Sequence, residues 1–255
     1  MKLIDTHTHL YAKQFDDDRK EVVQRAINSG VETMLLPNID RSSIKGMNNL
    51  IAMFPNNCFS MMGLHPCDVD ENFQKELDFL YKELKQGSYI AVGEIGIDLY
   101  WNKNTEEIQK DAFIQQLQWR IEFDLPVAIH IRNSFDQVFE CIEKVNHAKL
   151  RGVFHCFTGN VEQAQHAIKL GFMLGVGGVV TFKNSGLDKT LKKISLEHLL
   201  LETDSPFLAP DPYRGKRNES SYLTIVAQKL AEINEKDIST IAAITSENAK
   251  KLFRL

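Results

Sequence analysis

The sequence predicts an α/β fold, a TIM-type eight-stranded parallel β/α barrel, and three observations support this. The chain has 255 residues, close to the ~250 typical of one such barrel. Short apolar, β-branched runs alternate with longer amphipathic stretches, and there are eight such runs. Each run is continuously hydrophobic, as expected for a strand of a parallel sheet that is covered on both faces.

The eight apolar runs are predicted to be strands. They are Leu3–Asp5, Thr33–Leu36, Phe59–Gly63, Ile90–Val92, Val127–Ile129, Gly152–Phe154, Phe172–Val176 and Leu199–Leu201. No low-complexity segment, charged tail or linker-like change in composition interrupts them. We therefore expect residues 1–255 to form a single domain.

Helices are predicted between these strands. The stretch Glu21–Ile27 is followed by Gly30, a residue suited to the end of a helix. Asn104 and Glu107 form a capping-box pattern ahead of a run with helical periodicity.

Composition narrows the class of protein. The net charge of −4 argues against a protein that coats DNA, since such proteins are usually basic. It does not exclude a nuclease, because bound divalent metals supply positive charge locally. The four cysteines are scattered without a C-x-x-C pair, which indicates reduced, mostly buried thiols. The N-terminus has no apolar signal segment and no run approaches the ~18 residues of a membrane span, so we expect a cytoplasmic protein.

Side chains able to bind metals or substrate follow six of the eight predicted strands. In chain order they are His7 and His9, then His65, then Glu94 and Asp98, then His130 and Arg132, then His155, and finally Glu202 and Asp204. In a barrel of this type the carboxyl ends of all strands meet on one rim, where active sites lie. The other two strands lead to Asn38 and to Gly175, Gly177 and Gly178, glycines expected to keep space open above the site.

The histidines and carboxylates at these strand ends predict a metal site. His7 and His9 are two residues apart, so both point to the same side of an extended strand. Alone, this pair is equally typical of two exposed histidines capping a strand. The further residues at equivalent positions favour metal, because unpaired buried ionisable groups are costly. They are Glu94, His130, His155 and Asp204.

Four histidines and two carboxylates exceed the three protein ligands of a catalytic zinc. The surplus predicts two divalent metal ions, with Glu94 as the bridging carboxylate. Zn²⁺ or Mn²⁺ suits such a mixed site, and Mg²⁺ suits one with more carboxylate character. Two such ions would activate a hydroxide and neutralise charge on a phosphoryl or carbonyl oxygen. Asp204 is expected to ligate one ion and to take the proton from the attacking water.

Three further residues are expected to contact substrate. His65 is not needed as a ligand and is predicted to contact a phosphate or the leaving oxygen, or else to be structural. Arg132 faces the same side as His130 and is predicted to clamp a phosphate oxygen, or to form a salt bridge with a loop carboxylate. Arg214 belongs to a basic stretch, 213–218, that would meet a nucleic-acid backbone or be a solvated loop.

Several neighbours are expected to support the site. Asp98 and Glu202 would orient ligand histidines or a water, and Asp5 would accept hydrogen bonds beneath the site. Trp101 would stack on a base or sugar, or pack in a lid. Trp119 is expected to pack in a helix.

These motifs resemble the ordered signatures of the TatD-related metal-dependent deoxyribonucleases. The matching segments are Ile4–Leu10, Gly63–Pro66, Val92–Asp98, His130–Arg132, Val153–Gly159 and Leu201–Pro206. The resemblance covers nearly the whole chain and implies a metallo-dependent hydrolase architecture. Ser220 departs from the proline common at that place, which concerns the rigidity of a loop and not the metal site.

The resemblance also implies a ligand set and a substrate. One metal would be held by His7, His9, Glu94 and Asp204. The second would be held by Glu94, His130 and His155. The expected reaction is hydrolysis of DNA, either single-stranded or at its ends, and in some members of the family it is that of an exonuclease. No membrane and no obligate protein partner is expected.

Two rival interpretations remain open. One is a hydrolase of the wider amidohydrolase group that cleaves C–N or ester bonds of a small molecule. Many of those bridge their metals with a carbamylated lysine, but no lysine falls within the strand-end motifs here. The other is a metal-stabilised binding or scaffold protein, which would need fewer ligands.

Overall fold

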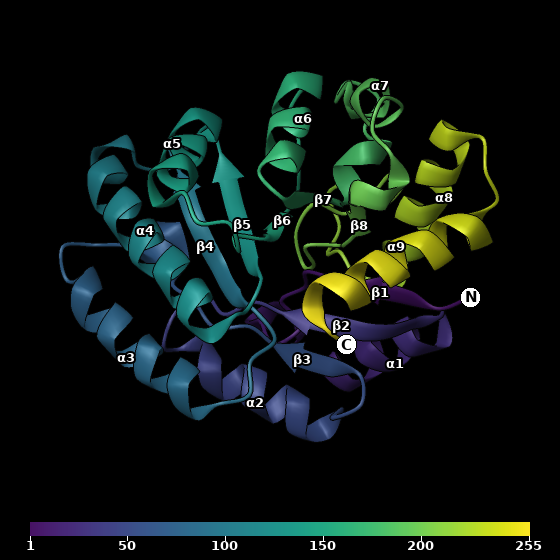
Figure 1. Cartoon of the computed structure of the whole chain (residues 1–255). Coiled ribbons are helices and arrows are strands. Elements are labelled where there is room, and N and C mark those ends of the chain that lie inside the picture. The colour runs from purple at the N-terminus through teal and green to yellow at the C-terminus, as the bar shows by residue number, and fades with distance from the viewer.

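The structure is a computed structural model that describes all 255 residues. Eight short parallel strands form its centre (Figure 1). The strands are β1 (Leu3–Asp5), β2 (Val31–Leu36), β3 (Cys58–Ser60), β4 (Val92–Asp98), β5 (Val127–Arg132), β6 (Gly152–Phe154), β7 (Phe172–Val176) and β8 (Leu199–Leu201). They pair in sequence order, β1 to β3 in one sheet and β4 to β8 in another, and every pair is parallel.

Backbone hydrogen bonds join the two sheets at both edges. Near β3 and β4, the Met62 N–H donates to the Ala91 carbonyl at 3.1 Å. Near β1 and β8, the Thr6 N–H donates to the Leu201 carbonyl at 3.0 Å. Strand neighbours therefore run from β1 to β8 and return to β1, which is the TIM-type arrangement predicted from the sequence.

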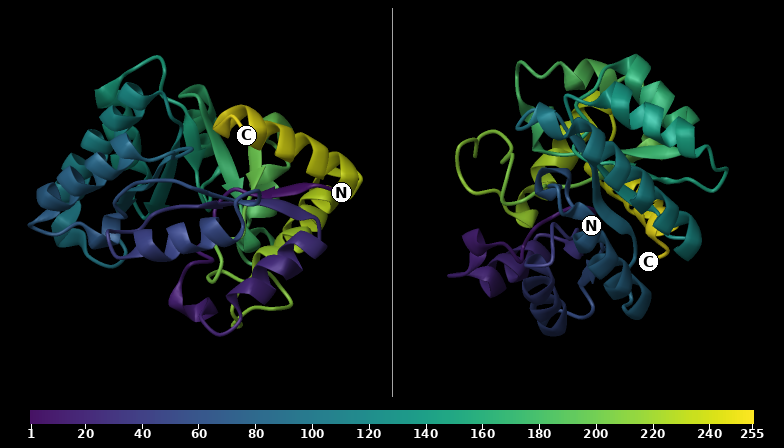
Figure 2. Two further views of the ribbon diagram at one scale, coloured as in Figure 1. Left: turned by 90° about the horizontal axis from the view of Figure 1, so that it is seen from below. Right: turned by 90° about the vertical axis from the view of Figure 1, so that its left-hand side faces the viewer.

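Helices lie outside the strands in each view (Figures 1 and 2). They are α1 (Arg19–Asn28), α2 (Ser43–Met53), α3 (Phe73–Gln86), α4 (Glu106–Phe123), α5 (Phe135–Val145), α6 (Val161–Lys169), α7 (Leu187–Leu191), α8 (Leu223–Asn234) and α9 (Ile238–Phe253). Each connection between successive strands contains one helix, as parallel pairing requires. None of the helices combines the length and hydrophobicity that a membrane-spanning segment needs.

Apolar side chains pack in two layers. The larger layer, of 55 buried residues, includes Ile95 and Ile97 of β4, which alternate with Glu94 and Asp98 along that strand. A smaller layer takes residues from seven strands or their ends and from α9, where Leu252 and Phe253 contribute. It is made of Ile4, Leu35, Met61, Ala91, Ala128, Val153, Leu200, Ala249, Leu252 and Phe253. The polar residues of the strand ends thus lie above a filled apolar interior.

The structure corrects several local predictions. The third strand is Cys58–Ser60 rather than Phe59–Gly63, and the fifth continues beyond Ile129 to Arg132. The fourth strand is not Ile90–Val92 but begins at Val92 and continues to Asp98, so Glu94 lies within it. Glycine and aspartate disfavour strands, but burial and pairing with β5 outweigh this propensity. The Asn104 capping box does not form, because α4 begins only at Glu106 and Asn104 lies in a preceding turn.

Candidate metal centre

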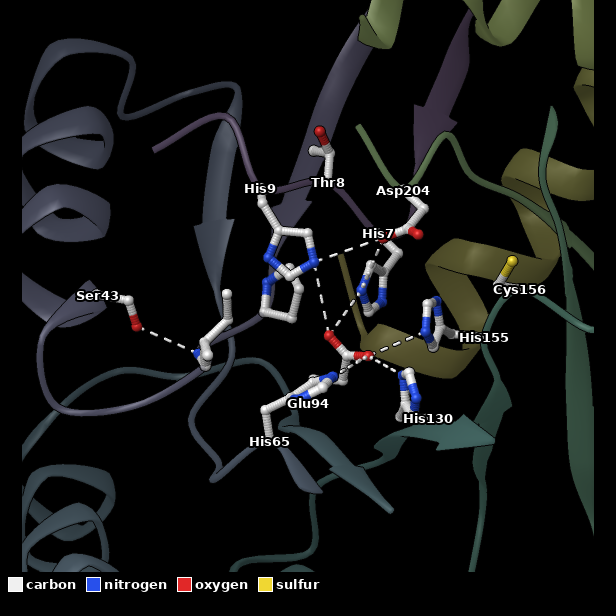
Figure 3. Close-up of polar contacts among 12 residues, drawn as sticks. His7, Thr8, His9, Ser43, His65, Glu94, His130, His155, Cys156 and Asp204 are labelled. Atoms are coloured by element: carbon white, nitrogen blue, oxygen red, sulfur yellow. Dashed lines mark hydrogen bonds and ion pairs between the residues drawn. The ribbon is translucent and has the colours of Figure 1, made fainter. Parts of the chain in front are cut away.

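One buried carboxylate, Glu94, lies at the centre of the strand-end residues (Figure 3). Its Oε2 is 3.1 Å from His7 Nε2 and 3.5 Å from His9 Nε2. Asp204 approaches the same two nitrogens, with its Oδ1 3.8 Å from His7 and 3.5 Å from His9. These four side chains, from the ends of β1 and β8 and from β4, form the first donor group.

The other oxygen of Glu94 faces a second set of histidines. Oε1 is 2.9 Å from His130 Nδ1 and 3.0 Å from His155 Nε2. His65 Nε2 lies 3.5 Å from the same oxygen. The carboxylate therefore has one oxygen directed at each donor group, which is the orientation that a bridging ligand requires.

Hydrogen bonds beneath the first group hold the ends of β1 and β8 together. Asp5 accepts from the Thr203 N–H at 2.9 Å and from the Thr203 hydroxyl at 2.6 Å. The Thr8 and Ser205 hydroxyls lie 2.6 Å apart. Burial raises the pKa of Asp5 to about 7, although these hydrogen bonds act in the opposite direction. Asp5 thus accepts hydrogen bonds beneath the site, as the sequence predicts.

The hydrogen-bond network assigns a tautomer to His9. Its Nδ1 lies 2.9 Å from the Tyr11 hydroxyl, and that hydroxyl donates to the Pro37 carbonyl at 2.5 Å. Because the Tyr11 proton is used for Pro37, the Tyr11 oxygen accepts from His9 Nδ1–H. Nε2 of His9 then keeps its lone pair and can bind a metal.

Carboxylates face the outer nitrogens of both His130 and His155, with a hydrogen bond at His130 and only an ion-pair contact at His155. Asp98 Oδ2 lies 2.9 Å from His130 Nε2, which leaves Nδ1 free toward Glu94. Glu202 Oε1 lies 3.4 Å from His155 Nδ1, which leaves Nε2 toward Glu94. Both carboxylates therefore occupy the orienting positions expected from the sequence.

His65 directs an N–H, rather than a lone pair, at Glu94. Its Nδ1 accepts a hydrogen bond from the Cys67 N–H at 3.1 Å. A neutral imidazole has one N–H, so the proton resides on Nε2, the nitrogen that faces Glu94. His65 is thus disposed to donate a hydrogen bond rather than to bind a metal.

The donor set fits divalent cations. Four carboxylates lie among the histidines, and no lysine or arginine nitrogen comes within 4.0 Å of any of them. They are Glu94, Asp98, Glu202 and Asp204. Burial acts to raise the pKa of Glu94, but the charges of His155 and His7 hold it well below its ordinary value. Such concentrated buried negative charge is stabilised by a bound cation.

Three combinations of side chains place ligand atoms within 4.8 Å of one another. They are His7 with His155 and Asp204, His7 with His9 and Glu94, and His65 with Glu94 and His130. Every metal ligand predicted from the sequence therefore lies in one connected cluster. The His7 and His155 rings stack at 3.8 Å between centroids, which connects the two donor groups directly.

The cluster opens into a cavity of about 890 Å³. His65, Trp101, Arg132 and Arg214 also line this cavity, as residues expected to meet a substrate should. Arg132 forms no carboxylate salt bridge, so of its two predicted roles only the contact with a phosphate oxygen stays a prediction. Its guanidinium lies over the Tyr100 ring, 3.8 Å from the centroid.

Other expectations need correction. Gly175 does not leave open space, since a Cβ there would collide with the Glu202 carboxylate. In the basic stretch, Arg217 is paired with Asp18 and so does not face the cavity as a free cation.

The thiols are less uniformly buried than expected. Cys58 and Cys141 are buried, whereas Cys67 is exposed and Cys156 is partly exposed. Both of the latter line the cavity.

The sequence reasoning missed Tyr11. It lies two residues beyond His9, as His9 lies two beyond His7, and this spacing was the available signal. Trp119 packs in α4 as expected and is 8% exposed.

Comparison with known proteins identifies relatives over the whole length. Residues 4–254 match the family model for TatD related DNase. The chain is 39% identical over 254 residues to a Bacillus subtilis (strain 168) protein named "Uncharacterized metal-dependent hydrolase YabD", and the alignment covers 99% of both chains. It is 32% identical over 257 residues to the "3'-5' ssDNA/RNA exonuclease TatD" of Escherichia fergusonii, covering 98% of both.

A solved structure gives the same result. The crystal structure of YJJV, a TatD homolog from Escherichia coli K12, is similar with a TM-score of 0.93 and 28% sequence identity. The match covers 99% of this chain and 98% of that one. The fold and the order of its elements are thus those of a known hydrolase architecture.

Proposed function

The chain belongs to the TatD related DNase family of metal-dependent hydrolases, and from this premise we propose that it hydrolyses phosphodiester bonds in DNA at a dinuclear metal site. One observation carries the proposal. The two oxygens of the buried Glu94 carboxylate face two different groups of histidine nitrogens. We further propose that residues 1–255 act as one domain.

We assign the ligands from the tautomers and distances. Glu94 Oε2, His7, His9 and Asp204 would hold one metal, and the second would be held by Glu94 Oε1 with two further histidines. Those two are His130 and His155. Four imidazoles with two carboxylates suit Zn²⁺ or Mn²⁺ better than Mg²⁺, which prefers oxygen ligands.

When bound, two divalent ions supply a Lewis-acidic centre that neutralises phosphoryl charge and makes a water acidic. Asp204 directs Oδ1 at the histidines and lies at the cavity wall, where its carboxylate takes the proton of the attacking water. Burial acts to raise its pKa, but the His9 hydrogen bond and nearby histidines hold it below the ordinary value, so the carboxylate is ionised.

His65 has a different part in the reaction. Its Nε2–H points toward the cluster and would donate to a non-bridging phosphate oxygen or to the leaving oxygen.

Glu94 fixes the separation of the two donor groups because it is fully buried and contacts both.

The nucleic-acid substrate is supported by the relatives. One is named as a 3'-5' exonuclease of single-stranded DNA and RNA and aligns over nearly its full length. The chain's exposed arginines in the cavity suit a polyanion. We therefore propose that the 3' end of a single strand is the preferred site of cleavage.

The test is hydrolysis of a 5'-labelled single-stranded DNA after chelation, with Mg²⁺, Mn²⁺ or Zn²⁺ added back. We expect Glu94→Gln to lose at least ~10³-fold of kcat, since the loss of one bridging ligand disturbs both groups. Glu247→Gln, an exposed carboxylate on α9, is the matched control. Cleavage of amides or lactones without cleavage of DNA would replace the nuclease by an amidohydrolase.

A further inference from the structure

Two exposed aromatic rings lie next to an arginine, and one of them, Trp101, lines the cavity together with that arginine, Arg132. Tyr100 and Trp101 follow β4 and are 54% and 70% exposed. Their rings meet edge to face at 4.9 Å. The Arg132 guanidinium lies 3.8 Å from the centroid of Tyr100 and 5.3 Å from that of Trp101. No carboxylate lies within salt-bridge distance of this guanidinium, so its charge is available to a ligand.

A second arginine beside an aromatic ring lies on the β7–β8 side of the cavity. We call each arginine, together with its adjoining ring or rings, a stacking pair. The Arg214 guanidinium lies 4.0 Å from the centroid of Phe182. Arg214 also has no carboxylate partner. Both residues line the cavity of the cluster and also a second cavity of about 620 Å³, which Lys183 lines as well. The pair therefore stands where the two cavities adjoin.

The metal cluster shares one cavity with these two pairs. The first pair comes from the ends of β4 and β5, and the second follows β7 and β8, while His155 and Asp204 line the cavity shared by both. Phe207, 48% exposed, contacts His9 edge to face with 6.0 Å between centroids. Apolar ring surface thus continues from the cluster toward the rim.

Aromatic rings that are exposed, as in Tyr100 and Trp101, or partly exposed, as in Phe182, beside unpaired guanidinium groups are suited to a particular ligand chemistry. Unpaired nucleobases stack on aromatic rings and on guanidinium planes, and the adjoining phosphates attract the charge. Bases within a duplex are already stacked and cannot offer their faces. A cavity of 890 Å³ lies high in the ~300–1,000 Å³ range of ligand sites, which is more than one phosphodiester group fills.

We propose that the protein holds single-stranded nucleic acid on these two stacking pairs, Tyr100 and Trp101 with Arg132, and Phe182 with Arg214. Bases on the two sides of the scissile phosphate rest on different pairs. This assignment rests on the proposed nuclease function and adds how the strand is recognised. It also explains how an acidic protein binds a polyanion, since only a few unpaired cations are placed at the site.

The chain contains two tryptophans, Trp101 at 70% exposure and Trp119 at 8%. The fluorescence of the exposed Trp101 can therefore report directly on a bound base. In Trp119→Phe, all tryptophan emission comes from Trp101. We titrate the metal-loaded variant with a hydrolysis-resistant phosphorothioate (dT)8. We expect at least half of the emission to be quenched, and Trp101→Phe to show no comparable change. Unaltered Trp101 emission at saturating oligonucleotide would overturn the proposal.

Kinetics provide the second measurement. We expect Trp101→Ala to raise KM for a single-stranded oligonucleotide about tenfold, within the effect of one lost base stack, with a smaller change in kcat. An abasic strand, which keeps the phosphates but lacks bases, should show no such rise. Trp119→Phe is the matched control. An equal rise in KM on the abasic strand would sink the stacking role.

Arg132→Lys separates stacking from simple charge. Lysine keeps the positive charge but lacks the planar guanidinium. We expect KM for the oligonucleotide to remain raised at least fivefold in this variant. Full rescue by lysine would show a phosphate contact without stacking and overturn this part of the proposal.

Failure of this inference is distinguishable from failure of the proposed function. If the wild type cleaves bis(4-nitrophenyl) phosphate but no DNA, the nuclease function fails and this inference fails with it. If the wild type cleaves DNA and Trp101→Ala has the same KM, only the stacking pairs are rejected.

Discussion

Two clusters of ionisable side chains differ in how their charges are balanced. The metal cluster contains four carboxylates, Glu94, Asp98, Glu202 and Asp204, whose only basic neighbours within 4.0 Å are histidines. A second cluster, which we call the rim network, contains two carboxylates and two arginines. It joins α1 and the loop before it to the loop after β8. Its members are Asp18, Arg25, Arg217 and Glu219.

The rim network is complete in itself. Arg217 contacts Asp18 at 2.7 Å and Glu219 at 3.0 Å, and Arg25 reaches the same two carboxylates at 3.0 and 2.9 Å. Figure 2 shows the two loops projecting on the same side of the molecule. The metal cluster has no such internal partner. Clusters of similar residues can thus serve opposite ends: arginines balance the carboxylates of the rim network, whereas the metal cluster has only histidines and, under the proposed function, would gain its remaining positive charge from bound cations.

Chelation should reveal this difference most strongly. A metal present at 100 times its Kd stabilises the folded state by about 2.7 kcal/mol. For a chain of this size that corresponds to roughly 5–10 °C in Tm. We expect EDTA to lower the Tm of the wild type and of Arg217→Ala by the same amount, and to have little effect on Glu94→Gln. Thermal melts with and without EDTA check this; an equal EDTA shift in Glu94→Gln would contradict the ligand assignment.

Tyr11→Phe should produce the next largest effect. The hydroxyl accepts the His9 Nδ1 proton and so presents Nε2 to a metal. Loss of an orienting partner typically lowers metal affinity 10- to 100-fold. Competition with a chromophoric chelator measures the change, and Tyr222→Phe, which lies outside the cluster, is the control. Unchanged affinity in Tyr11→Phe would mean that the first donor group does not depend on this tautomer.

Much of the metal cluster could be predicted from the sequence because parallel strands end on one rim. His7, His130 and His155 lie far apart in the chain, yet each follows or ends an apolar run. Once those runs are interpreted as strands of one barrel, convergence of the side chains follows from the topology. The continuous hydrophobicity of residues 34–36 in β2, 127–129 in β5 and all of β8 made this interpretation possible.

Contacts set by loops could not be predicted in this way. The stacking of Arg132 on Tyr100 depends on how the chain turns after β4, and no periodicity encodes that turn. The pairing of Arg217 with Asp18 joins residues 199 positions apart, so a basic stretch looked uniformly available when one of its cations was already bound. The extent of β4 was missed for a different reason: its glycines and carboxylates are polar-loop residues by composition, and only tertiary burial makes them strand.

Arg217→Ala should give the smallest effect, and its pH dependence tests whether the rim network is self-contained. Exposed ion pairs contribute about 0–1 kcal/mol, and Asp18 is one-third exposed, so we expect a loss near that range in urea unfolding at pH 7 with EDTA present. The hydrogen bond from Arg217 holds the pKa of Asp18 at about 2, below its ordinary value of 3.8.

Because the folded-state pKa is the lower one, this stabilisation is present above pH 3.8 and is lost as the pH falls through about 2. The difference in unfolding free energy between wild type and Arg217→Ala should therefore shrink between pH 4 and pH 2.5. Lys192→Ala, which removes a pair exposed on both sides, should differ little from wild type at any pH. A difference for Arg217→Ala that is as large at pH 2.5 as at pH 7 would show that packing over Phe15, 4.6 Å from the guanidinium, and not charge, is what this arginine contributes.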